Sequence, residues 1–119
     1  MKSTALAALF AALPLIAAAD IPTVTAVDAI ANGDTWRFDV SILHADTGWE
    51  HYADGWGVYT IDGIELGYRT LVHPHVNEQP FTRSLSGVTI PAGTTEISII
   101  PHDLVHGDGP KFTVTLPTP

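Results

Sequence analysis

The chain has 119 residues, 45% of them hydrophobic, and its thirteen Asp and Glu against five Lys and Arg give a formal net charge of −8. This acidic balance excludes an ordinary nucleic-acid-binding role, which requires clustered Lys and Arg to neutralise phosphates. The sequence contains no cysteine, so disulfides and thiolate metal ligands are excluded as well.

The amino-terminal segment, residues 1–19, has the pattern of a cleaved export signal. Residues 5–18 form an apolar run, and Ala17–Ala19 offers a small-residue cleavage site. The run is shorter than the roughly 20 residues that span a bilayer, and no cysteine stands beside the cleavage point for lipid attachment. We therefore expect an exported protein, periplasmic or secreted, with no membrane span and a single domain at residues 20–119.

The remaining chain alternates short extended runs with turn residues such as Asn-Gly and Asp-Gly. The clearest strand is 36–42, where apolar and polar residues alternate with the period of a half-buried strand. Seven segments are predicted as strands: 24–30, 36–42, 56–61, 64–72, 81–90, 96–100 and 111–116. Seven short strands without helices indicate an all-β fold, a single antiparallel β-sandwich of the immunoglobulin or fibronectin type III kind. A small barrel is the alternative.

Histidines are the candidate metal ligands, and all of them lie in or beside the polar connections. Four form two spaced pairs, His73 with His75 and His102 with His106. Because a residue before proline is kept extended, His73 and His75 should point to the same side of the chain. Imidazole suits zinc and copper, and the lack of sulfur ligands favours Zn or Cu(II) over Cu(I).

We therefore predict a histidine cluster that binds a transition metal. The four paired histidines are the expected ligands, and further candidate ligands are His44, His51 and Glu78. Asp103 and Asp108 lie beside the second pair, where a carboxylate can orient an imidazole.

Calcium binding is a less favoured alternative. Its candidate ligands would be hard carboxylate oxygens, which calcium takes six to eight at a time, from Asp46, Glu50, Asp54, Asp62 and Glu65. These carboxylates follow no EF-hand spacing. Enzyme activity is not expected, because Ser84 and Ser86 lack the Gly-x-Ser-x-Gly elbow of a hydrolase.

The polar connection at 44–55 also predicts a recognition surface. Trp49 and Tyr52 stand there among turn residues, where an aromatic ring can contact a protein or carbohydrate partner. Trp36 and Trp56 lie in strand-like runs and are expected in the core. A pH-responsive interaction is a third possibility, because unperturbed histidines change charge between about pH 5 and 8.

Three segments together resemble a family of small exported bacterial proteins. They are DTGWEHYADGW at 46–56, HPHVNEQPFTRSLSGV at 73–88 and HDLVHG at 102–107. The resemblance spans most of residues 20–119 and implies that the three connections belong to one design. It assigns no activity to any residue.

Overall fold

The computed structural model describes residues 21–118; the expected export signal at 1–19, together with Asp20 and Pro119, lies outside them. The described chain forms eight strands: β1 (Thr23–Asn32), β2 (Thr35–Leu43), β3 (Ala53–Thr60), β4 (Glu65–Thr70), β5 (Phe81–Val88), β6 (Glu96–Asp103), β7 (Gly107–Asp108) and β8 (Phe112–Thr115).

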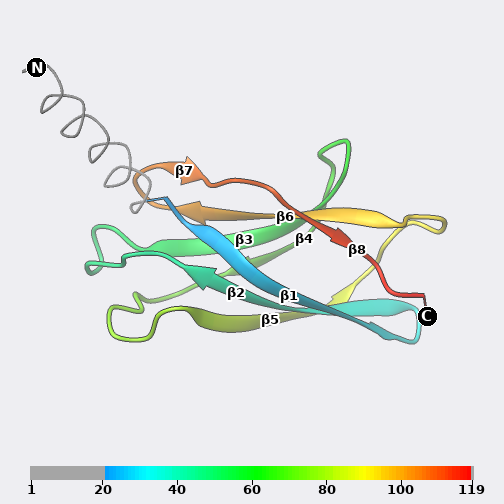
Figure 1. Cartoon of the computed structure of the whole chain (residues 1–119), viewed down its shortest axis with the longest axis horizontal. Helices are drawn as coiled ribbons and strands as arrows, with labels where there is room; N and C mark the ends of the chain where they lie inside the picture. Colours follow the sequence, from blue (N-terminus) through cyan, green and yellow to red (C-terminus); the bar gives the residue numbers. More distant parts are fainter. Residues whose placement is uncertain (1–20, 119) are drawn as a thin grey trace, which may run out of the picture.

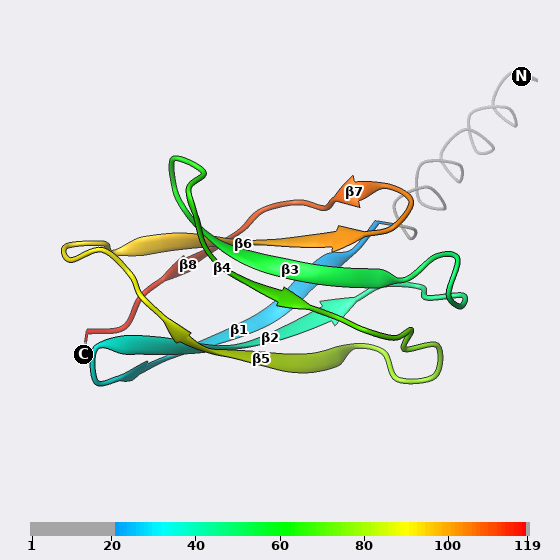
Figure 2. The ribbon, with the colours of Figure 1, turned by 180° about the vertical axis from the view of Figure 1, so that it is seen from behind.

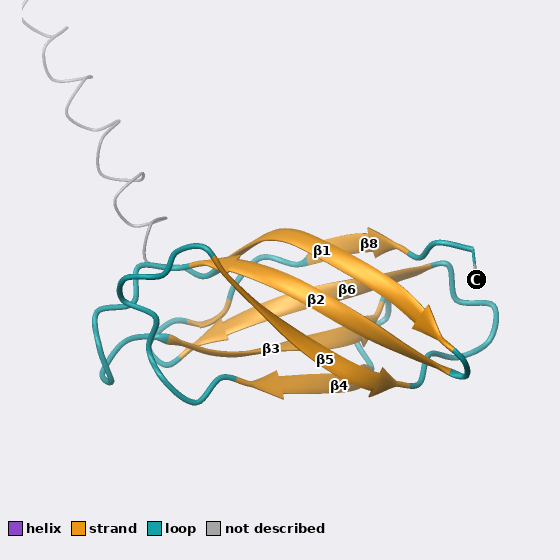
Figure 3. Cartoon of the chain, turned by 90° about the horizontal axis from the view of Figure 1, so that it is seen from below, coloured by secondary structure: helices purple, strands orange, loops and turns teal. Residues whose placement is uncertain are grey.

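The strands form two antiparallel sheets packed face to face. The smaller sheet has the order β1-β2-β5, and the larger has the order β4-β3-β6 with β7 and β8 both pairing with β6. Figures 1 and 3 show the two layers, with the strands of the smaller sheet crossing those of the larger one. The predicted all-β sandwich is confirmed.

Period-2 alternation in the sequence builds the core between the sheets. On β2, Phe38, Val40 and Ile42 all point inward and are at most 1% exposed. Trp56 on β3 is fully buried, as the sequence predicted, and Trp36 packs against the core while partly exposed. Burying each large apolar side chain stabilises the fold by about 1.5–3 kcal/mol.

At the histidine end β3 and β6 each extend three residues further than the sequence predicted, and one short strand was not predicted. β3 begins at Ala53 instead of 56, and β6 continues to Asp103 instead of ending at 100. The extensions pair with each other, since Ala53 lies opposite Asp103. The two-residue β7 pairs with the end of β6. Cross-strand hydrogen bonding therefore continues into segments whose composition predicted loops.

Six of the seven connections between strands divide between the two ends of the sandwich, and the seventh, 109–111, runs beside β6 from β7 to β8. At one end lie 44–52, 71–80 and 104–106, which we call the histidine end (Figures 1 and 2). At the other end, the turn end, lie the connections at 33–34, 61–64 and 89–95. Within residues 21–118, no helix is long and apolar enough to cross a membrane.

Candidate metal centre

Two buried polar residues, His44 and Asp103, continue the inward faces of their strands. His44 follows Phe38, Val40 and Ile42 at the next alternate position, one residue past the end of β2. Asp103 occupies the last position of β6, in phase with the fully buried Ile97 and Ile99. Since β2 and β6 belong to facing sheets, the two side chains meet between the sheets at the histidine end.

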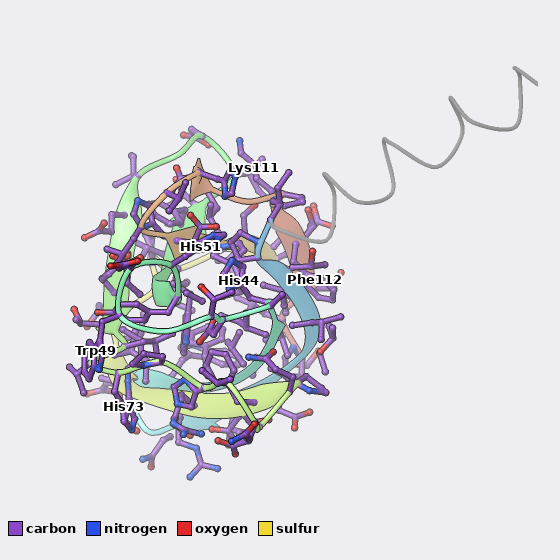
Figure 4. The ribbon with its side chains drawn as sticks, turned by 90° about the vertical axis from the view of Figure 1, so that its left-hand side faces the viewer. His44, Trp49, His51, His73, Lys111 and Phe112 are labelled. Atoms are coloured by element: carbon purple, nitrogen blue, oxygen red, sulfur yellow. The ribbon has the colours of Figure 1, made fainter. Side chains whose placement is uncertain are left out.

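The carboxylate of Asp103 is the centre of a histidine cluster. Its Oδ2 lies 3.0 Å from His44 Nε2, 3.3 Å from His51 Nε2 and 3.2 Å from His106 Nδ1. Candidate ligand atoms of His44, His51 and Asp103 all lie within 4.8 Å of one another, and this is the one such group among the described residues. Figure 4, which looks onto this end, shows His44 and His51 close together near its middle.

His44 is held from its other side by Asp46. His44 Nδ1 lies 2.5 Å from Asp46 Oδ1, and both side chains are fully buried. A carboxylate on one imidazole nitrogen fixes the ring and its tautomer, as it does for metal-bound histidines. When Nδ1–H donates to Asp46, the neutral ring turns the lone pair of Nε2 toward Asp103. Two lone pairs 3.0 Å apart require a proton or a metal cation between them.

Asp46 is positioned by backbone donors from two other segments. Its Oδ1 also accepts a 3.1 Å hydrogen bond from the backbone N–H of Ala53, and its Oδ2 accepts one of 2.7 Å from that of His75. Gln79 joins the same segments, because its Oε1 accepts from the backbone N–H of His44 and its Nε2 donates to the carbonyl of His75. The 71–80 connection is thereby attached to the cluster.

The turn after β6 holds Asp103 in its ionised form. Burial alone would raise the pKa of Asp103, but hydrogen bonds from the backbone and ring of His106, the backbone of Val105 and the ring of His51 outweigh it and lower the pKa to about 2. The two backbone N–H groups both donate to Oδ1. Oδ2 is thus left to face the three imidazoles.

The pair His73 and His75 lies at the same end but outside the three-residue group. Their rings touch edge to face at 4.8 Å, and His75 stacks on Phe81 at 4.0 Å. Arg83 donates to His75 Nε2 at 2.9 Å, so that nitrogen is already an acceptor. Burial, then the charge of Arg83, lower the pKa of His75. His75 is therefore a neutral, packed side chain.

The pair His102 and His106 is divided between two environments. Adjacent strand residues point to opposite faces, so the side chain of His102 points away from the cluster that contains Asp103. Its Nδ1 lies 2.5 Å from Asp54 Oδ1. His106 reaches Asp103 from the turn. Glu78 contacts Arg83 at 3.3 Å. The structure thus does not bring His73, His75, His102 and His106 together as one group.

The aromatic candidates of the 44–52 connection face outward. Trp49 is 67% exposed, and its ring meets that of the half-buried Tyr52 edge to face at 5.8 Å. Figure 4 places Trp49 at the edge of this end, away from His44.

Sequence reasoning ranked the ligands differently from the geometry. It gave His44 and His51 a secondary place and Asp103 an orienting role, and it considered Asp46 as a calcium ligand. The signal that would have found them is alternation: counting every second residue from the apolar runs of β2 and β6 leads directly to His44 and Asp103. None of the carboxylates considered for calcium except Asp46 takes part in the cluster, where it supports a histidine.

Comparison with known proteins gives a partial match. The chain is 43% identical over 84 residues to a "Putative lipoprotein" of the haloarchaeon Halomicrobium mukohataei, an alignment that covers 71% of this chain and 41% of that protein. The chain therefore spans less than half of the relative's length. No protein-family model matches the chain, and no solved structure matches it.

Proposed function

We propose that the domain binds a transition-metal ion, Zn or Cu(II), at the histidine end through His44, His51 and Asp103, with His106 as the fourth ligand. The observation that carries the proposal is the approach of three imidazole nitrogens to one buried carboxylate oxygen, at 3.0, 3.3 and 3.2 Å. Ligands about 2.0–2.1 Å from a tetrahedral zinc ion lie roughly 3.3 Å from one another. These three separations match the three edges that meet at the carboxylate oxygen of such a tetrahedron, and the ligand atoms of His44, His51 and Asp103 lie within 4.8 Å of one another.

The donor set supports the choice of metal. Imidazole and carboxylate suit zinc and Cu(II), whereas calcium takes oxygen ligands only. His106 Nδ1 lies 3.2 Å from Asp103 Oδ2, and the centroid of its exposed ring lies 5.0 Å from that of His51, so as the fourth ligand its ring would turn toward His44 and His51. The carboxylate of Asp46 supplies the hydrogen bond that metal-bound histidines ordinarily make with their second nitrogen.

Export is part of the proposal. It is supported by the charge and apolar pattern of residues 1–19 and by the name of the haloarchaeal relative. A protein of this kind would meet its metal outside the cytoplasm, as a mature domain beginning near residue 20.

Titration with zinc and Cu(II), followed by calorimetry, tests the site. We expect 1:1 binding that is weakened at least about tenfold by His51→Gln or His106→Gln, since each removes a ligand. His102→Gln is the matched control, because it changes a histidine of the same end whose ring lies on Asp54. Binding that is unchanged in the first two variants, or lost in the control, would contradict the assignment.

The exposed aromatic pair supports a second candidate function, recognition of a protein or carbohydrate partner. Trp49 presents most of its surface to solvent beside Tyr52, and tryptophan is enriched at binding hot spots. Glycan arrays and pull-downs with wild-type protein and Trp49→Ala would test it. A partner whose binding survives the substitution would not use this face.

A further inference from the structure

We propose that Arg83, His75 and Asp46, which we call the Asp46 support, set the metal affinity of the site by fixing the orientation and tautomer of His44. The inference rests on the proposed metal function and gives a role to the His-Pro-His motif that the ligand set does not use. None of the three residues would touch the metal.

The outermost residue of the Asp46 support is Arg83, which contacts His75. A guanidinium is always a donor, so its 2.9 Å contact makes His75 Nε2 an acceptor. The neutral His75 ring must then carry its hydrogen on Nδ1. This nitrogen is buried and has no hydrogen-bond partner among residues 21–118, and it lies 3.9 Å from Asp46 Oδ2.

Asp46 connects the segment that contains His75 to the ring of His44. Its two oxygens hold three hydrogen bonds, from the His44 ring and from the backbones of Ala53 and His75. The buried Nδ1 of His75 lies near the same carboxylate, beyond hydrogen-bond distance at 3.9 Å, where its N–H dipole favours the negative charge of Asp46. Together they hold the Asp46 carboxylate against Nδ1 of His44, and this orientation of the ring directs Nε2 of His44 toward Asp103.

Packing holds His75 in this position. Its ring stacks on Phe81 with an interplanar angle of 11°, and Phe81 is buried at the start of β5. His73, two residues earlier, packs edge to face against the His75 ring and is not one of the three hydrogen-bond donors to Asp46. The two histidines of the motif should therefore differ sharply in their effect on the metal.

Zinc affinity of matched variants tests the inference. His75→Phe keeps the stack on Phe81 and removes both nitrogens, and we expect zinc to bind about 10-fold more weakly, the lower part of the range for partners of metal-bound histidines. Arg83→Gln should weaken binding in the same direction by a smaller factor. His75→Asn, which restores an N–H near the position of Nδ1, should recover part of the loss. His73→Phe should bind like wild type.

Two results would overturn the support. Equal weakening of zinc binding by His73→Phe and His75→Phe would make both histidines direct ligands, and wild-type zinc affinity in His75→Phe would remove any role for the motif.

A measurement on metal-free protein separates failure of this inference from failure of the proposed metal function. In ¹⁵N NMR spectra of metal-free protein, Nδ1 of His44 should be protonated by its contact with Asp46, and the His44 ring resonances should shift in His75→Phe but not in His73→Phe. Unshifted resonances in both variants would refute the support even if zinc binds, and no zinc binding with the expected shifts would refute only the metal function.

Discussion

At the turn end the chain reverses through connections in which Gly33, Gly63 and Gly93 have φ values of 64°, 94° and 85° and the ionisable groups are exposed, whereas at the histidine end two of the three connections, 44–52 and 71–80, are longer and bury ionisable groups. Tight turns satisfy the geometry of a sandwich without burying any charge. Placing His44, Asp46 and Asp103 between the sheets has a desolvation cost that close packing of apolar residues would avoid. The buried charges of the histidine end therefore support the proposed metal site, whereas the turn end serves to reverse the chain.

Removing the central carboxylate should have the largest effect. Asp103→Asn keeps the size of a fully buried side chain but removes the charge that three imidazoles contact. We expect loss of zinc binding and a fall of about 3 kcal/mol in the free energy of unfolding, since breaking a buried ion pair costs roughly 3–5 kcal/mol. Urea denaturation of metal-free protein measures the stability.

Asp108→Asn is the control for this substitution, because Asp108 is an exposed carboxylate on β7. Its unfolding free energy should stay within about 0.5 kcal/mol of wild type. Similar losses in both variants would mean that negative charge in general, and not the buried cluster, supports this end.

Acid should destabilise the histidine end through the same carboxylate. The pKa of Asp103 is lowered from 3.8 to about 2 in the folded protein, so its stabilising contribution is complete above pH 3.8 and is lost as the pH falls through 2. The contribution is about 2 kcal/mol. The difference in unfolding free energy between wild type and Asp103→Asn, measured as a function of pH, isolates the contribution of Asp103. Curves that stay parallel between pH 4 and 2 would contradict the pKa shift.

A substitution at the turn end should lower the stability of the protein without changing its zinc affinity. Gly33 has a φ of 64°, and a Cβ added there would meet no atom within 4 Å, so Gly33→Ala changes only the backbone energy. We expect a loss of about 1 kcal/mol with zinc affinity unchanged. A weaker zinc affinity in this variant would show that the two ends are coupled.

The smallest effect is expected at the exposed rim of the histidine end. Trp49→Ala removes a side chain that is 67% exposed, and the unfolding free energy should change by less than about 0.5 kcal/mol. Thermal melts measure it. A larger loss would mean that Trp49 packs onto the domain, which would weaken its candidacy for partner binding.

Local sequence pattern predicted the sandwich because the strand signal is local: the alternation from Trp36 to Ile42 appears in the sequence and in the burial of β2. The cluster depends on information that is not local. His44 and Asp103 meet because β2 and β6 lie in facing sheets, and His51 joins them because Ala53 pairs with Asp103. Spacing within His73-x-His75 and His102-x-x-x-His106 carried no such information, and strand alternation in fact separates His102 from Asp103.

Anomalous diffraction from a zinc-loaded crystal would locate the proposed metal ion directly. We expect one peak at the zinc edge, about 2.0–2.1 Å from His44 Nε2, His51 Nε2 and an oxygen of Asp103, with His106 turned in as the fourth ligand. A peak bound instead by His73 and His75, or by His102 and Asp54, would contradict the proposed site.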